Sequence, residues 1–341
     1  MPKVRFIWLL FALLATSASA QVEFIQQKDS VLIQVNGNDF STLRFGAERY
    51  KPYLRPLLTA SGKAVTRGYP DDPQPGELLT IPHQVGLWVG FEKVSGYDFN
   101  ELDPSYDDSF DKKHRSGKKE HRRGKIVFKE IKKMQGGPDR GVLVFTADWV
   151  TPEGQVLLQQ EEELTIYSEP KDSRTMDVKF VLRPKASVTF EDENDGIVGL
   201  RLGAPFVEEN GGRVFNFIGT EGANEVIGKR SPWVEFEGTL DDGERVGVML
   251  MDHPDNYNFP LRWKVRPWAL IYASSFGEHE FYEEKSPPYD KYHGVPPNGV
   301  KDMGLTLKKD EALTFQFRLL IHPIPMDLYP EWLKFAKPAT Q

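Results

Sequence analysis

The sequence predicts an all-β fold, namely a large single-domain antiparallel β-sandwich, and two observations support this prediction. Short runs rich in Val, Ile, Phe, Tyr and Thr recur along the 341 residues, with Gly, Pro, Asn and Asp between them. Segments with the 3.6-residue period of a helix are nearly absent. No repeat of about 20 to 50 residues is visible, which argues against a propeller or a solenoid.

Nine segments show the clearest strand patterns. They span residues 31–35, 86–91, 125–131, 142–149, 156–167, 175–182, 246–251, 269–274 and 313–321. Turn-forming runs such as Asn36-Gly37-Asn38 separate them. Segments 142–149 and 156–167 are expected to form a long hairpin, which 175–182 continues as a meander.

One short C-terminal helix is expected at residues 326–335, because Leu328, Trp332 and Phe335 can share one face. Turn spacing and aromatic content stay even from residue 22 to residue 322. The chain after residue 20 is therefore expected to form one domain, residues 21–341.

The first twenty residues have the pattern of a secretory signal peptide. Lys3 and Arg5 precede an apolar run that ends at Ala18-Ser19-Ala20, a small-x-small cleavage signal. We expect cleavage before Gln21 and export to the periplasm or the medium. No later apolar run is long enough to cross a membrane, so membrane insertion is not expected.

Charge and composition exclude several function classes. The formal net charge is −7, and loss of the signal would make it more negative, so nucleic-acid binding is not expected. The chain has no cysteine, which excludes disulfides, cysteine catalysis and thiolate metal sites. The sequence signatures of serine esterases, dinucleotide-binding folds, phosphate loops and HExxH metalloproteases are also missing, so neither a cofactor nor a metal is predicted. Nothing in the sequence indicates the oligomeric state.

Two segments interrupt the strand pattern. Residues 103–124 form an acidic and then basic block, and residues 283–302 are rich in Pro, Gly and charge. Solvated surface loops are the expected structure of both, and His114 and His121 then lie at the surface. The alternative is a lid over a binding site.

Four clusters combine a rigid turn with a cation and an aromatic ring, which suits a polar, oxygen-rich ligand such as a sugar. They read TRGYPDDP (66–73), IPHQVGLWVGFEKVSGYDF (81–99), GKRSPWVEFEG (228–238) and MDHPDNYNFPLRWKVRP (251–267). The candidate site residues in them are His83 and His253 as general acid or base, with Arg67, Lys229, Arg230, Trp233, Trp263, Arg266, Asn256 and Asp255 as ligand-binding residues.

Structural roles compete with these interpretations. A histidine beside a proline often bonds to the backbone of a turn, and Asp252 and Asp255 can cap one. The aromatic residues inside strand patterns, Trp88, Trp149 and Trp268, are predicted to lie in the core. The least ordinary carboxylates for glycoside hydrolysis, which needs a pair of them, are Glu221, Asp195 and Asp255.

Several blocks of the chain, read in order, resemble the PmoA-like family, a bacterial family of unknown function often labelled methane oxygenase PmoA. The blocks are YKPYLRPLLTASGKAVTRGYP, PHQVGLWVGFEKVSGYDF, FEDENDGIVGLRL, GGRVFN leading to GKRSPWVEFEG, and DHPDNYNFPLRWKVRPWALIYASSFG. The last block is the most specific, because it keeps the family's pattern at His253, Pro254, Asn256, Pro260, Trp263 and Arg266. The resemblance runs from about residue 22 to residue 322.

The resemblance implies a soluble β-sandwich, similar to the mutarotase-like supersandwich, in bacteria that degrade complex carbohydrates. Many relatives carry an HPHHR-type motif where this chain has TIPHQVG, so His83 is kept and Val85 replaces an arginine. The segment 103–124 is also longer than the family's usual connection. The membrane subunit that bears the PmoA name crosses the membrane several times, so methane oxidation is not expected here.

The sequence thus supports two hypotheses. The first is an exported enzyme that acts on a sugar or sugar derivative by hydrolysis, elimination or epimerisation. The second is a non-catalytic carbohydrate-binding or scaffold protein, in which the histidines are structural.

Overall fold

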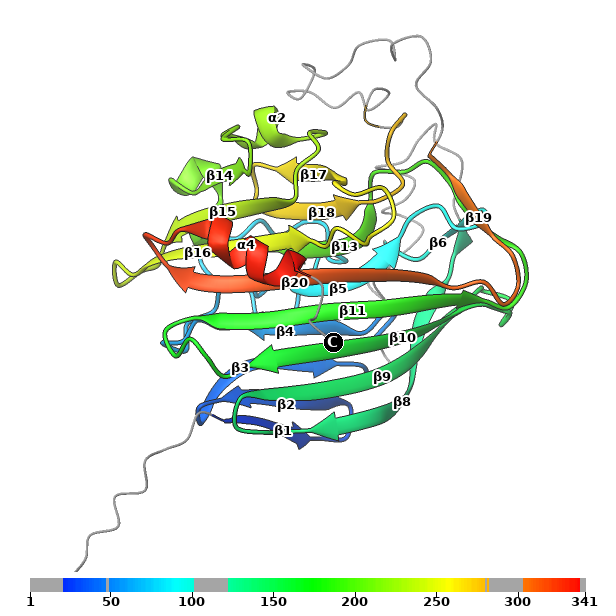
Figure 1. Cartoon of the computed structure of the whole chain (residues 1–341), viewed down its shortest axis with the longest axis horizontal. Helices are drawn as coiled ribbons and strands as arrows, with labels where there is room; N and C mark the ends of the chain where they lie inside the picture. Colours follow the sequence, from blue (N-terminus) through cyan, green and yellow to red (C-terminus); the bar gives the residue numbers. More distant parts are fainter. Residues whose placement is uncertain (1–20, 47–48, 101–121, 280, 282–302, 338–341) are drawn as a thin grey trace, which may run out of the picture.

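The fold consists of two eight-stranded antiparallel sheets packed face to face (Figure 1). The computed structural model describes residues 21–46, 49–100, 122–279, 281 and 303–337. The first sheet contains, in spatial order, β1 (Val22–Gln26), β2 (Ser30–Val35), β3 (Asn38–Arg44), β4 (Tyr53–Leu57), β5 (Leu87–Phe91), β13 (Gly196–Arg201), β18 (Leu270–Ser274) and β17 (Arg262–Arg266). The second contains β14 (Arg213–Asn216), β15 (Trp233–Thr239), β16 (Arg245–Asp252), β20 (Leu313–Pro323), β11 (Arg174–Pro184), β10 (Val156–Tyr167), β9 (Arg140–Val150) and β8 (Lys125–Gln135).

Smaller elements complete the described chain. Two short two-stranded sheets pair β6 (Tyr97–Asp98) with β7 (Arg122–Arg123), and β12 (Val188–Phe190) with β19 (Leu305–Leu307). The helices are α2 (Ala223–Val226) and α4 (Leu328–Ala336), with two 3₁₀ turns, η1 (Ala204–Phe206) and η2 (Glu208–Asn210). No helix among the described residues is long and apolar enough to cross a membrane.

The main core lies between the two sheets, because alternate residues of each strand point inward. In β10, for example, Leu158, Leu164 and Ile166 are fully buried in this core. Each sheet also buries apolar side chains on its outward face. On the first sheet these are Tyr53, Val85, Trp88, Leu270 and Tyr272.

Helix α4 covers part of the outward face of the second sheet. Its Phe335 packs with Met249 and Met251 of β16 and with Leu320 of β20. Figure 1 shows the helix lying across these two strands. The side chain of Asp327 caps its first turn by accepting a hydrogen bond from the Tyr329 backbone N–H.

The prediction of an antiparallel β-sandwich is confirmed. All nine predicted strands are present, and β9, β10 and β11 pair consecutively as the predicted meander. The C-terminal helix is also confirmed, but α2 was not predicted. The signal segment, most of 103–124 with His114 and His121, and all of 283–302 lie outside the described residues.

Candidate functional site

The best candidate site is the outward face of the first sheet over β5, β13, β18 and β17, which we call the polar face. Gly199 of β13 pairs with Trp88 on one side and with Tyr272 on the other, and Tyr272 pairs with Lys264. Directly paired residues share a face, so these side chains form one row across the sheet.

A glycine in this row makes room for the indole of Trp88. A Cβ atom at Gly199 would lie 2.3 Å from the Trp88 ring, so only glycine fits without displacing it. The ring of Tyr272 meets the indole edge-on, with centroids 5.5 Å apart. The two rings, of which Trp88 is 2% and Tyr272 0% exposed, therefore form a fixed aromatic platform that is buried on the polar face.

Asn100 joins the two rings of this platform. The Nε1 of Trp88 donates to Oδ1 of Asn100 at 3.0 Å, and Nδ2 of Asn100 donates to the Tyr272 hydroxyl at 3.0 Å. Lys51 places its ammonium 4.7 Å from the indole centroid and donates to the Asn100 carbonyl at 2.6 Å. Aromatic and polar side chains thus lie side by side, which is the combination of groups that sugar recognition uses.

A second row, two residues along the strands, carries two arginines. Arg201 of β13 pairs with Leu270, which pairs with Arg266 of β17. The Arg201 side chain is only about 2% exposed, and its Nη1 donates to Oε1 of Gln84 at 3.1 Å. Burial, reinforced by the nearby charge of Arg67, holds the pKa of Arg201 well below its ordinary value.

Arg67 has a structural role beside this row. Its Nη1 donates to the carbonyls of Leu78 and Thr80, and its Nη2 donates to those of Ile81 and Gln84. All four terminal N–H groups are thereby engaged by one loop. The prediction that Arg67 holds ligand oxygens is therefore replaced by a role in positioning the loop before β5.

His83 lies in this loop and is buried. It sits between Ile81 and Gln84, the two residues whose carbonyls Arg67 Nη2 holds. Because Gln84 in turn accepts from Arg201, the loop that carries His83 is fastened to the polar face. The role of His83 as a site histidine stays a prediction.

A charged group borders the first row. Nζ of Lys264 donates to Oδ2 of Asp195 at 2.7 Å and to Oδ1 of Asn194 at 2.8 Å. Although burial alone raises the pKa of Asp195, Lys264 and then Arg266 lower it below its ordinary value. Asp195, one of the predicted carboxylates, is therefore an ionised group at the edge of the polar face.

Asp195 belongs to a cluster of three carboxylates. Oxygen atoms of Glu92, Glu193 and Asp195 lie within 4.8 Å of one another. Lys93 pairs with Glu193 at 2.8 Å, and Lys264 pairs with Asp195. These ammonium groups supply the positive charge that a cation would supply, so we assign no metal to the cluster.

A cleft of about 970 Å³ opens next to Arg67, which is among its lining residues. Arg44, Arg55 and Lys63 line it together with the acidic Glu77. Arg67 is the residue that this cleft shares with the border of the polar face.

His253 does not lie on the polar face. It follows β16 of the second sheet, and its ring packs edge-on against Phe335 of α4, with centroids 5.0 Å apart. Its Nδ1 accepts a hydrogen bond from the Asp255 backbone N–H at 3.2 Å, and burial lowers its pKa. The shared acid/base site predicted for His83 and His253 is therefore not formed, since α4 and the polar face lie on opposite outer faces of the sandwich.

The residues that follow His253 form a structural turn. Nδ2 of Asn256 donates to Oδ1 of Asp252 at 2.8 Å and to the Gln316 carbonyl at 2.7 Å, while its Oδ1 accepts from the Gln316 N–H. The Asp255 side chain is 77% exposed. The structure thus assigns Asn256 a role in the turn, in place of the predicted ligand contact. The ligand contact predicted for the exposed Asp255 stays a prediction.

The two predicted stacking tryptophans are buried elsewhere. Trp263 is fully buried between the sheets, where its Nε1 donates to the Ser231 carbonyl at 2.7 Å. Trp233 packs with Met249 and Met251 on the outward face of the second sheet. Neither ring lies on the polar face, whereas Trp88, predicted to be in the core, does. Trp149 is in the core as predicted.

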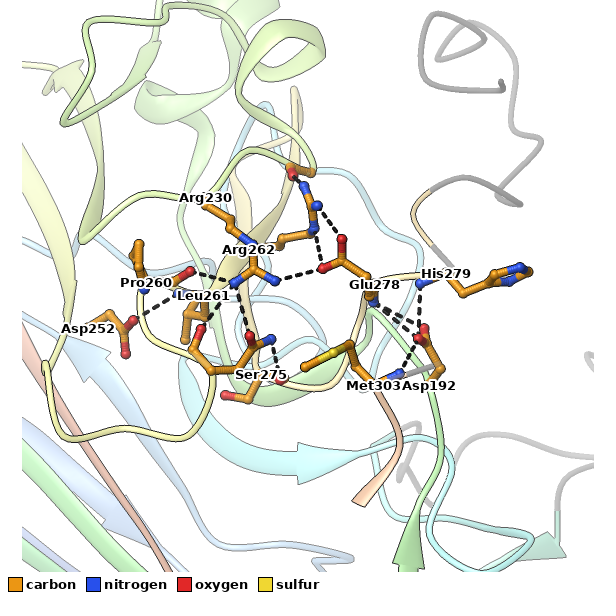
Figure 2. Close-up of polar contacts among 12 residues, drawn as sticks. Asp192, Arg230, Asp252, Pro260, Leu261, Arg262, Ser275, Glu278, His279 and Met303 are labelled. Carbon is orange, nitrogen blue, oxygen red and sulfur yellow. Dashed lines mark hydrogen bonds and ion pairs between the residues drawn. The ribbon is translucent and has the colours of Figure 1, made fainter. Parts of the chain in front are cut away.

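Arg230 takes part in a polar network at the edge of the first sheet (Figure 2). Its Nη1 donates to the carbonyls of Asn258 and Pro260, and its Nη2 pairs with Glu278 at 2.7 Å. Arg262 pairs with the same carboxylate. Arg230 thereby fixes the turn before β17, which replaces its predicted role in ligand binding.

The remaining candidates lie outside the polar face. Lys229 is half-buried next to α2, where its backbone N–H donates to the Val226 carbonyl. Glu221 is exposed and pairs with Arg213 at the surface. Of the predicted residues, the polar face or its border brings together Arg67, His83, Asp195 and Arg266. Sequence reasoning missed Arg201, Asn100, Lys264 and Tyr272.

Comparisons with known proteins add the following. No curated protein matches the chain. A solved structure, galactose 1-epimerase from Lactobacillus acidophilus NCFM, is similar over 89% of this chain and 99% of that one, at 9% identity and a TM-score of 0.40. A family model described as a family of unknown function matches residues 30–328, and nothing in it supports the methane-oxygenase label. Because this match spans most of the sequence, the chain belongs to that family, DUF6807.

Proposed function

We propose that the protein binds a sugar or sugar derivative on the polar face and acts on it there, by hydrolysis, elimination or epimerisation. The observation that carries this proposal is the platform of Trp88 and Tyr272, held by Asn100 and bordered by cationic side chains. Aromatic rings accept the C–H side of a sugar, while Lys and Arg donate to its oxygens.

His83 is the proposed general acid or base. It is the predicted site histidine whose loop is fastened to the polar face, through Arg67 and Gln84. An imidazole titrates near neutral pH, which suits proton transfer at a sugar hydroxyl or at a carbon next to a carbonyl.

A matched pair of variants tests this proposal. Binding and turnover are measured on a panel of glycans and keto-sugars for wild type, His83→Gln and His253→Gln. We expect His83→Gln to keep binding and lose at least 100-fold in turnover, in line with the usual contribution of a general acid or base. His253→Gln, altered on the second sheet, should keep both. Equal turnover of wild type and His83→Gln would refute the assignment of His83.

A second candidate is a non-catalytic carbohydrate-binding protein. Two ion pairs favour this candidate, namely Asp195 with Lys264 and Glu193 with Lys93. They engage two carboxylates that could otherwise transfer protons. Binding without turnover of any panel sugar by wild type would select this candidate.

Export is part of the proposal and rests on residues 1–20. Expression of the full chain in a bacterium, followed by N-terminal sequencing of the periplasmic and medium fractions, should give a protein that begins at Gln21. Retention of the intact N-terminus in the cytoplasm would contradict it. Methane oxidation is not proposed.

A further inference from the structure

The Arg201 side chain has an unusual set of contacts for a buried cation. Its Nη1 donates to Gln84, a neutral acceptor, while among the described residues neither its Nε nor its Nη2 has a hydrogen-bond partner. The edge of the guanidinium formed by Nε and Nη2 thus makes no hydrogen bond to a described residue, although Arg201 is only about 2% exposed.

No described carboxylate forms an ion pair with Arg201. The acidic side chain that acts on it from a distance is Glu77. The oxygens of Glu77 accept hydrogen bonds from the backbone N–H groups of Gly68, Tyr69 and Gln74. A buried charge without a counter-charge is costly and is normally paired, so this arrangement points to an anionic partner beyond the described residues.

The neighbours of Arg201 add positive charge. Arg67 lies close enough to lower the pKa of Arg201. Arg266 lies on the same row of the polar face, one strand beyond Leu270. An anionic ligand would therefore be attracted to this end of the face, next to the platform of Trp88 and Tyr272.

We propose that the ligand of the polar face is an acidic sugar whose carboxylate binds the Nε–Nη2 edge of Arg201. The identification of a sugar rests on the proposed function, whereas the carboxylate rests on Arg201 itself. The planar edge of a guanidinium matches the two oxygens of a carboxylate in a bidentate pair. Gln84 fixes Nη1 and so orients that edge.

Isothermal titration calorimetry with paired probes tests the inference. Oligomers of galacturonate and glucuronate are compared with the corresponding neutral oligomers of galactose and glucose, and with 6-sulfated galactose oligomers. We expect wild type to bind at least one uronate oligomer tenfold or more tightly than its neutral counterpart, and Arg201→Gln to lose this preference.

Gln84→Glu is the sharper variant, because it supplies Arg201 with a carboxylate from the chain itself. We expect it to keep the fold, to unfold at a higher urea concentration than wild type at pH 7, and to lose the uronate preference while still binding the neutral oligomer. Arg174→Gln is the matched control. It alters a buried arginine of the second sheet that donates to backbone carbonyls, and it should keep the preference.

The outcomes separate the two proposals. Equal binding of neutral and acidic oligomers by wild type would overturn the proposal that Arg201 binds a carboxylate. A uronate preference that survives Gln84→Glu would overturn it as well. Either result would leave the proposed sugar binding intact. Tighter binding of the sulfated oligomer than of the uronate would also overturn it. Binding of no oligomer at all would refute the proposed function itself.

Discussion

Glu235 and His322 form a buried ion pair in the second sheet, with Nε2 of His322 3.3 Å from Oε1 of Glu235 and each side chain about 1% exposed. Gly247 lies between their strands, and a Cβ atom there would come within 2.5 Å of both side chains. Although burial lowers the pKa of His322, the Glu235 carboxylate raises it above its ordinary value of 6.5.

Because of the Glu235–His322 pair, we expect the stability of the protein to depend on pH. The pKa of His322 is raised in the folded state, so its protonation stabilises the fold. This contribution to the free energy of unfolding is full below the unfolded-state pKa and is lost as pH rises through the folded-state pKa. His322→Gln should therefore lower the free energy of unfolding by roughly 3 kcal/mol at pH 5.5, and by less at pH 9. Urea denaturation at the two pH values measures this difference.

His253→Gln provides the opposite case. Burial lowers the pKa of His253, so its neutral form is favoured in the fold and the wild type loses stability as pH falls. The cost of His253→Gln should thus shrink toward low pH. The same pH trend in both variants would contradict the assigned shifts.

Glu162 is an acid in the core between the sheets. It lies on β10 between Phe145 and Phe180 of the neighbouring strands, and its Oε2 accepts from Nε2 of Gln160 at 2.6 Å. Gln160 in turn accepts from Nε1 of Trp149 at 2.8 Å. Burial raises the pKa of Glu162 from 4.5 to about 8.

Glu162→Gln should stabilise the protein at alkaline pH. The raised pKa means that the wild type is most stable below about pH 4.5 and loses stability as pH rises to about 8. The variant lacks this titration, so its advantage should reach about 3–5 kcal/mol above pH 8 and be small near pH 5. Urea denaturation at pH 5, 7 and 9 checks this, with the exposed Glu161→Gln as control. Parallel pH profiles for wild type and Glu162→Gln would refute it.

The sequence predicted most of the second sheet because its long strands alternate regularly, as β10 does with Leu158 and Leu164 inward. It did not identify β13, because Gly196 and Gly199 weaken the strand pattern there. Since Arg201 lies on β13, the most informative side chain of the polar face was missed together with its strand.

The candidate site was predicted only in part for a related reason. Alternation shows that Trp88 is buried, but it does not show whether it faces the core or a covered outer face. The cluster that contains His253 and Arg266 is continuous in sequence, yet the chain crosses from β16 of the second sheet to β17 of the first within it. Proximity along the chain therefore suggested a shared site that the fold divides.

Asp192 holds two chain segments together at the edge of the first sheet (Figure 2). Its carboxylate accepts hydrogen bonds from the backbone N–H groups of Glu278, His279 and Met303, at 3.1, 2.9 and 2.9 Å. Asp192→Ala leaves these groups without this acceptor and should cost about 1–3 kcal/mol locally.

Hydrogen–deuterium exchange at the amides of Glu278, His279 and Met303 measures this loss. We expect these amides to exchange at least fivefold faster in Asp192→Ala than in wild type, while the amides of β10 keep their rates. Asp172→Ala is the control, because the exposed Asp172 accepts only from the neighbouring Ser173 hydroxyl among the described residues. Unchanged exchange in Asp192→Ala would show that the carboxylate does not hold these segments.

Gly199→Ala tests whether the polar face depends on the aromatic platform. The added methyl group would lie 2.3 Å from the Trp88 indole, so the ring must move and its hydrogen bond to Asn100 must lengthen or break. We expect a loss of about 1–3 kcal/mol in the free energy of unfolding, together with at least tenfold weaker sugar binding.

Gly203→Ala is the matched control, because its Cβ would meet nothing closer than 3.5 Å. Tryptophan fluorescence, urea denaturation and calorimetric titration of the three proteins distinguish the outcomes. Weaker binding in both variants would point to a general loss of structure, whereas full binding in Gly199→Ala would remove Trp88 from the site.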